Sequence, residues 1–163
     1  MKAENIIFGP ILFKCEVEQD SINKLKSLCN QDKKNLYAES LVGHFKTEYS
    51  IDSKKYQEIL QPQFDFFKKN YNSYFKRELG NLKVVDSWVN YMKAGDFNPP
   101  HIHSNCRFSS VLFVQFPKEI LKENDEHQAA SKGPGAIEFF YGENQRRDNV
   151  NSYAIVPKEG DMF

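Results

Sequence analysis

The spacing of apolar residues along this chain changes once, from a helical period in the first half to a strand period in the second. Over residues 53–79, large apolar side chains recur at intervals of three and four, which predicts a helical segment with one face on a core. Proline fits the first turn of a helix and disrupts its interior, so a second helix is predicted to begin at Pro62 and to end at Gly80. A shorter helix is predicted to follow a cap at Asp20 or Ser21.

After residue 80, apolar residues alternate with others at a period of two, which predicts β-strands. A kinked first strand is also predicted near the start of the chain. The predicted strands cover residues 6–17, 83–92, 106–116, 136–141 and 152–156. Two polar or charged stretches, 30–50 and 118–132, are predicted to be irregular, the second as an insertion or mobile loop. Helices followed by a run of strands indicate an α+β fold, with the strands rolled into a sandwich or barrel.

The composition of the chain indicates which classes of protein and which cellular compartment fit it. The chain has 163 residues, with 22 Lys and Arg against 22 Asp and Glu, so its formal net charge is zero. A neutral chain has no general attraction to nucleic acid or to anionic membranes. No apolar run approaches the ~20 residues of a membrane helix, and the start of the chain lacks a secretion signal. We therefore expect one cytoplasmic domain over residues 1–163, with helical support over about 20–80 and a β-rich core over about 83–163. A homodimer also fits these totals.

One short region has chemistry of its own, the segment 95–103, which ends in His101-Ile102-His103. In an extended chain, residues i and i+2 lie on the same face, so both imidazoles can reach one ion. Pro99 and Pro100 keep the approach extended and reduce the entropy lost on ordering the ligands. Neutral imidazole binds iron, zinc, copper and nickel. The pair is therefore a candidate metal site, and a polar pair at a strand edge is the alternative because His-x-His is common by chance.

Several other segments of the chain, taken together with this histidine pair, form a recognisable order. They are Phe8-Gly9-Pro10-Ile11, Ser87-Trp88-Val89-Asn90, Asn98-Pro99-Pro100-His101-Ile102-His103, Ser109-Ser110-Val111-Leu112-Phe113-Val114 with Pro117, Gly135-Ala136-Ile137-Glu138-Phe139 and Pro157-Lys158-Glu159-Gly160-Asp161-Met162-Phe163. In this order they resemble the Fe(II)- and 2-oxoglutarate-dependent oxygenase superfamily, in the branch found in bacteria and their phages. The resemblance spans most of the chain, and the stretch 118–132 lies outside it.

The resemblance implies a double-stranded β-helix, or jelly roll, with N-terminal helices packed on one side. It also implies a dioxygenase of the hydroxylase type that uses Fe(II) and 2-oxoglutarate, with His101 and His103 as metal ligands. His103 stands where the superfamily usually has Asp or Glu, although His-x-His is expected in this branch. Asn90 would lie one strand from the metal and could bind the 2-oxoglutarate cosubstrate. An ordinary strand amide, bonded to the backbone, is the alternative for Asn90.

The segment 157–163 resembles the start of a strand that, in the superfamily, leads to a distal His ligand and to an Arg that pairs with 2-oxoglutarate. We therefore expect the last strands of the jelly roll to be missing from these 163 residues. The substrate stays open between a small metabolite, a peptide side chain and a nucleobase. Specificity is expected to come from the stretches 30–50 and 118–132.

Two other functions fit part of the pattern. Gly95, five residues and then His101-x-His103 are how the first cupin motif opens, but that motif needs a Glu where this chain has Arg107 or Phe108. The non-enzymatic alternative is a jelly-roll module that binds a partner or carbohydrate and has lost its metal. Both alternatives keep the same fold class.

Plainer interpretations suffice for the other candidate residues. Trp88 is expected in the core and Cys106 as a buried thiol, since strands take up aromatic and thiol side chains readily. His127 is expected to be a solvated surface histidine. His44 could line a cleft, but its spacing to the other histidines carries no information.

Overall fold

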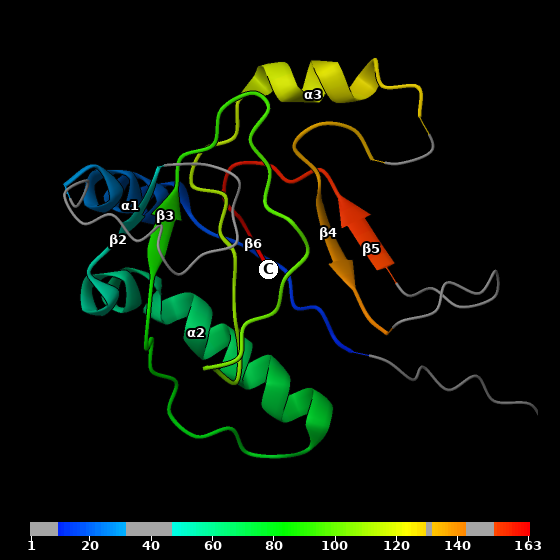
Figure 1. Ribbon diagram of the computed structural model, residues 1–163. Coiled ribbons are helices and arrows are strands. Elements are labelled where there is room, and N and C mark those ends of the chain that lie inside the picture. Colours follow the sequence, from blue (N-terminus) through cyan, green and yellow to red (C-terminus); the bar gives the residue numbers. More distant parts are fainter. Residues whose placement is uncertain (1–9, 32–46, 130–131, 143–151) are drawn as a thin grey trace, which may run out of the picture.

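The computed structural model of the protein describes residues 10–31, 47–129, 132–142 and 152–163. These residues form three helices and three two-stranded antiparallel sheets (Figure 1). The mixture of helices and small antiparallel sheets confirms the α+β class. Within the described residues no sheet closes on itself, so the predicted jelly roll is not confirmed. None of the described helices is long and apolar enough to cross a membrane.

The core lies where α1 (Gln19–Gln31) and α2 (Ser53–Phe75) pack against each other and against strand ends. Both helices form where the apolar spacing predicted them. The predicted cap of α1 is wrong, because the helix begins at Gln19 and both Asp20 and Ser21 lie inside its first turn. Ile22, Leu25 and Leu60 are almost completely buried in their contact. The buried apolar residues of this core are Val17, Ile22, Leu25, Leu28, Ile51, Leu60 and Met162.

The course of α2 corrects two predictions about its ends. The helix continues through Pro62 as one element, so the prediction of a second helix starting there is wrong. Core contacts on both sides of the proline, by Leu60 and Phe64, hold the two halves in line and offset the lost hydrogen bond. The helix ends at Phe75, with Lys76 as a left-handed cap at φ 50°, and Gly80 is not the cap.

A sheet of two short strands, β2 (Glu48–Ser50) and β3 (Trp88–Asn90), lies beside the helices. Glu48 pairs with Asn90 and Ser50 with Trp88. The predicted strand at 83–92 is thus reduced to its last part, and a strand exists at 48–50 where the chain was predicted to be irregular. Three residues are too few to show a period, and the pairing partner lies about forty residues away, so the sequence pattern did not reveal β2.

The strand β6 (Asp161–Met162) lies between two partners. On one side it pairs with β1 (Cys15–Glu16), the part of the predicted first strand that the structure retains. On the other side, backbone hydrogen bonds join residues 111–113 to residues 160–163, at 2.8–3.1 Å between nitrogen and oxygen. The long strand predicted at 106–116 is therefore limited to this short pairing, and its first residues are exposed coil.

The second half of the chain also contains a hairpin-like pair and a third helix. β4 (Ile137–Phe140) and β5 (Ser152–Ile155) form where strands were predicted, and they pair with each other. The charged stretch after Pro117 forms α3 (Lys118–Asp125), so the prediction of a loop or insertion is wrong there. Its Lys, Glu and Leu residues favour a helix even without a buried face, and charge alone concealed that preference.

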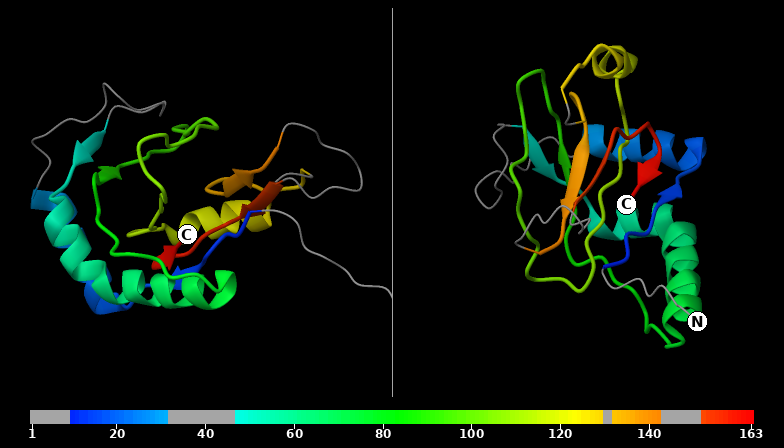
Figure 2. Two further views of the ribbon diagram at one scale, coloured as in Figure 1. Left: turned by 90° about the horizontal axis from the view of Figure 1, so that it is seen from below. Right: turned by 90° about the vertical axis from the view of Figure 1, so that its right-hand side faces the viewer.

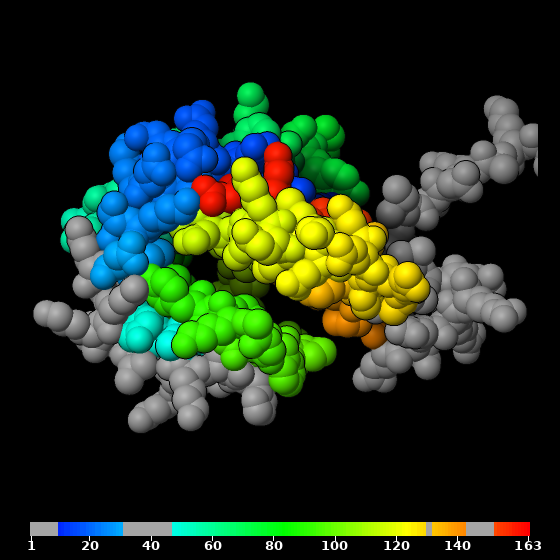
Figure 3. Space-filling model, turned by 90° about the horizontal axis from the view of Figure 1, so that it is seen from above, coloured from blue at the N-terminus to red at the C-terminus, as the bar shows by residue number. Residues whose placement is uncertain are grey.

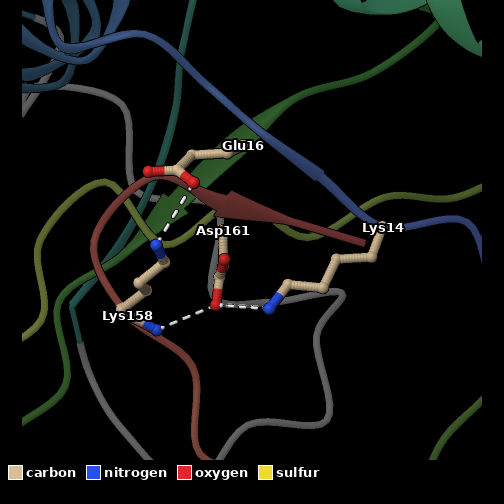
Figure 4. A network of polar contacts seen from close by, with 4 residues as sticks. All are labelled: Lys14, Glu16, Lys158 and Asp161. Carbon is tan, nitrogen blue, oxygen red and sulfur yellow. Dashed lines mark hydrogen bonds and ion pairs between the residues drawn. The ribbon is translucent and has the colours of Figure 1, made fainter.

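Polar contacts tie the two ends of the described chain together (Figure 4). The buried carboxylate of Asp161 forms an ion pair with Lys14, at 2.9 Å between Nζ and Oδ2. The same oxygen accepts the backbone N–H of Lys158 at 3.0 Å, and the Lys158 ammonium contacts Glu16 at 3.2 Å. These contacts fix the turn that leads into β6.

The segment that joins β3 to α3 crosses the opening between two sheets. Figure 2, in its left view, shows α2, the β2–β3 pair and the β4–β5 pair as a curved outline around this segment. In Figure 3 a hollow is visible between the green part of the chain that follows β3 and the yellow part around α3. The candidate histidines belong to the segment that crosses this opening.

Candidate metal centre

The two histidines lie on an extended coil segment after β3, not on a strand. Their rings are close, with centroids 5.0 Å apart and planes at 76°. Ile102, between them, points into solvent and is 89% exposed. This alternation is what an extended backbone dictates for residues i, i+1 and i+2, so the structure brings His101 and His103 together on one side.

One nitrogen of His101 is already engaged. Nδ1 lies 2.8 Å from the carbonyl oxygen of Pro99. A carbonyl only accepts hydrogen bonds, so Nδ1 carries a proton and donates, and in the neutral ring Nε2 keeps its lone pair. A backbone carbonyl on the far nitrogen orients and polarises many metal-binding histidines in this way. The prolines before His101 therefore do more than stiffen the chain, because one of them fixes the tautomer.

His103 lies against Trp88, with ring centroids 5.7 Å apart. His103 is exposed, but desolvation by its neighbours still lowers its pKa, and the charge of His101 lowers it further. Both effects favour the neutral imidazole, which is the form that binds metal ions. Trp88 itself is half-buried and does not belong to the cluster of buried core residues, contrary to the prediction, because the adjacent Val89 packs against the core instead.

The β2–β3 pair has two faces with different neighbours. Val89 packs against the helix core, and the hydroxyl of Tyr91 donates to Asn30 of α1 at 3.3 Å. The side chains that alternate with them, Trp88 and Asn90, lie on the opposite face, where Trp88 contacts His103. The buried Oδ1 of Asn90 has no hydrogen-bond partner among the described residues. The alternative interpretation of Asn90, a strand amide bonded to the backbone, therefore does not hold for its oxygen.

Glu48 is the residue that sequence reasoning missed. It lies directly across from Asn90 in the sheet, so both side chains are on the same face. The residue is only 1% exposed. Burial raises the pKa of Glu48, and the nearby charge of His101 lowers it in part. Its neighbours in sequence are polar and show no period, and only the pairing with β3 places it near the histidines.

The remaining candidates lie outside this group. Among the described residues, no three His, Cys, Asp or Glu side chains form a group that could hold a metal ion. His127 is exposed, as predicted, and Cys106 is exposed rather than buried, because the strand expected to cover it does not form there. His44 lies outside the described residues.

The donor set suits the ion and cosubstrate that the resemblance implies. Two imidazoles, one with its tautomer fixed and one biased to the neutral form, are ligands that Fe(II) accepts. The buried Oδ1 of Asn90 can only accept a hydrogen bond, so an anionic cosubstrate, which offers no donor, can be bound only by the protons of Nδ2. The residues present therefore fit Fe(II), and Asn90 suits the cosubstrate through Nδ2 alone.

Comparison with known proteins gives one match. Residues 86–163 match a family model described as "Putative 2OG-Fe(II) oxygenase". This segment includes β3, both histidines and the strand β6. No match was found among curated proteins or among solved structures.

Proposed function

We propose, because residues 86–163 match a family model of 2OG-Fe(II) oxygenases, that the protein is an Fe(II)- and 2-oxoglutarate-dependent dioxygenase of the hydroxylase type. The observation that carries the proposal is the position of His101 and His103 inside this segment, with ring centroids 5.0 Å apart. The proposal includes the jelly-roll arrangement of the strands. It also includes a small molecule or a side chain as substrate.

Each residue of the candidate centre would have a separate role. His101 and His103 would hold Fe(II), His101 through Nε2 because its Nδ1–H donates to Pro99. When bound, Fe(II) with 2-oxoglutarate supplies the activation of dioxygen that oxidises a C–H bond and releases succinate and carbon dioxide. The ring of Trp88 would shield one side of His103 from water. Asn90 would donate a hydrogen bond from Nδ2 to an oxygen of the cosubstrate.

Succinate formation tests this proposal without knowledge of the substrate, because such enzymes turn over 2-oxoglutarate slowly on their own. The protein would be incubated with Fe(II), 2-oxoglutarate and air, and succinate would be quantified by mass spectrometry. Variants H101A and H127A form a matched pair, since His127 is an exposed histidine outside the candidate centre. We expect succinate from the wild type and H127A, and none from H101A.

Three results would contradict the proposal. Succinate that H101A forms as fast as the wild type would come from another source. Absence of succinate together with tight Fe(II) binding would favour a cupin-type metalloprotein. Absence of both would favour a binding module without metal.

A further inference from the structure

We propose that Glu48 is the anionic member of this metal centre, and that its carboxylate stabilises the divalent ion held by His101 and His103. The inference deepens the proposed function and rests on it, because it concerns the same centre. It adds a residue that lies outside the segment matched by the family model.

The place of Glu48 follows from strand register. It pairs with Asn90, so the two side chains lie side by side on the face of the β2–β3 pair that carries Trp88. Trp88 contacts His103, and the charge of His101 is felt at Glu48. Glu48 therefore lies on the face of the sheet that contacts His103 through Trp88, the side away from the helices.

Among the described residues, the charge of Glu48 is balanced only in part, by His101. The residue is 1% exposed, and none of the described lysines and arginines forms an ion pair with it. The adjacent Oδ1 of Asn90 is buried and also has no donor among the described residues. A buried carboxylate whose charge is balanced only in part is costly, and such groups concentrate at functional sites. The Glu48 carboxylate beside the unpartnered oxygen of Asn90 is a suitable environment for a cation.

The histidine pair alone does not balance the charge of a divalent ion, so a carboxylate nearby would stabilise the bound metal. Two neutral imidazoles leave the full charge of a divalent ion uncompensated, whereas non-haem Fe(II) sites commonly combine two His with one carboxylate. His103 contributes no charge where a carboxylate would. Because the described side chains do not form a three-residue coordinating group, Glu48 acts through its charge from just outside the ligands.

A purely structural role for Glu48 makes a different prediction. If Glu48 supported the fold, its replacement by Gln would lower stability and metal affinity together. If Glu48 serves the ion, the metal-free protein carries a buried charge that Gln removes, so stability is unchanged or higher while metal affinity falls. A fall in Fe(II) affinity without a fall in stability therefore indicates that Glu48 serves the ion, and a fall in both indicates a structural role.

The experiment uses the full chain and Fe(II) alone, under nitrogen. Fe(II) affinity would be measured by calorimetric titration for the wild type, E48Q, E58Q and H101A. Glu58 is an exposed carboxylate on α2, so E58Q removes the same charge away from the candidate centre. The guanidinium midpoint of each metal-free protein would be measured in parallel.

We expect E48Q to bind Fe(II) about 10–100-fold more weakly than the wild type, the range typical of groups behind metal ligands. Its unfolding midpoint should equal or exceed that of the wild type, and E58Q should change neither quantity. Equal affinity of E48Q and E58Q would overturn the inference and leave the proposed function intact. A lowered midpoint of E48Q with weaker binding would also overturn it, in favour of a structural role. Wild-type binding that is absent, or that H101A retains, would overturn both.

Discussion

Lys14 is the only basic side chain among the described residues that forms an ion pair with Asp161, and its replacement by Met tests how the two ends of the described chain are joined. The side chain of Asp161 is 3% exposed and that of Lys14 is 39% exposed, with 2.9 Å between Nζ and Oδ2. Removing one partner of a fully buried pair costs about 3–5 kcal/mol, and removing one from an exposed pair costs about 0–1 kcal/mol. This pair has one buried end and one hydrated end, so we expect K14M to lower the free energy of unfolding by about 2 kcal/mol.

A second variant isolates the ion pair from other contacts of Lys14. Its ammonium also lies 5.1 Å from the ring centroid of Phe163, and Met loses that contact too. In D161N the amide oxygen can still accept the Lys158 N–H, but the charge is gone. We therefore expect K14M to cost only about 0.5 kcal/mol in a D161N background, which leaves a coupling of about 1.5 kcal/mol.

Guanidinium unfolding of the wild type, both single variants and the double variant would measure this coupling. Equal costs of K14M in the two backgrounds would refute the reasoning. They would mean that the buried carboxylate is stabilised by the Lys158 N–H alone, or that Lys14 acts only through its alkyl chain and the ring of Phe163.

Three further predictions concern single positions. L60A should lower the unfolding free energy by about 2–5 kcal/mol, because Leu60 is fully buried between the helices, and denaturant titration measures this. Asp52 caps α2, and the backbone N–H of Lys55 lowers its pKa, so its stabilisation is present above the unfolded-state pKa and is lost as the pH falls through the lower folded-state pKa. The stability difference between wild type and D52N should therefore vanish in acid, and a pH-independent difference would contradict this. G160A should cost about 1–2 kcal/mol, because φ is +90° and an added Cβ would lie 3.1 Å from a backbone oxygen, whereas G80A, with open space around it, should cost nothing in the same thermal melt.

The helices could be predicted from the sequence because each carries its own signal. Ile22, Leu25 and Leu28 recur at the helical interval in α1, and that spacing needs no partner to be visible. Pro62 misled the prediction, since the rule against interior proline is a matter of local energy that core contacts on both sides can offset.

The strands were predicted less well because their extent depends on partners. Residues 106–116 have a β-prone sequence, but only 111–113 find a partner, in β6. β2 has no sequence signal, and its existence follows from pairing with β3. Local preference therefore located strand-forming segments without fixing where pairing begins and ends.

The residues of the candidate centre also differ in whether the sequence could predict them. His101 and His103 could be proposed from their spacing, and Asn90 from the resemblance, because all three lie in one stretch of chain. Glu48 could not be proposed, since only the register of β2 against β3 brings it to this place. Residues that join a site through long-range pairing leave no local trace in a single sequence.

The binding of Fe(II) together with 2-oxoglutarate is the most direct test of the central claim. Metal-free protein would be titrated with Fe(II) and then with 2-oxoglutarate in the absence of oxygen, with a visible spectrum recorded at each step. Our account predicts a charge-transfer band of chelated 2-oxoglutarate in the wild type and its loss in H101A. A band of equal strength in both proteins, or no band in the wild type, would contradict the assignment of His101 and His103 as the iron ligands.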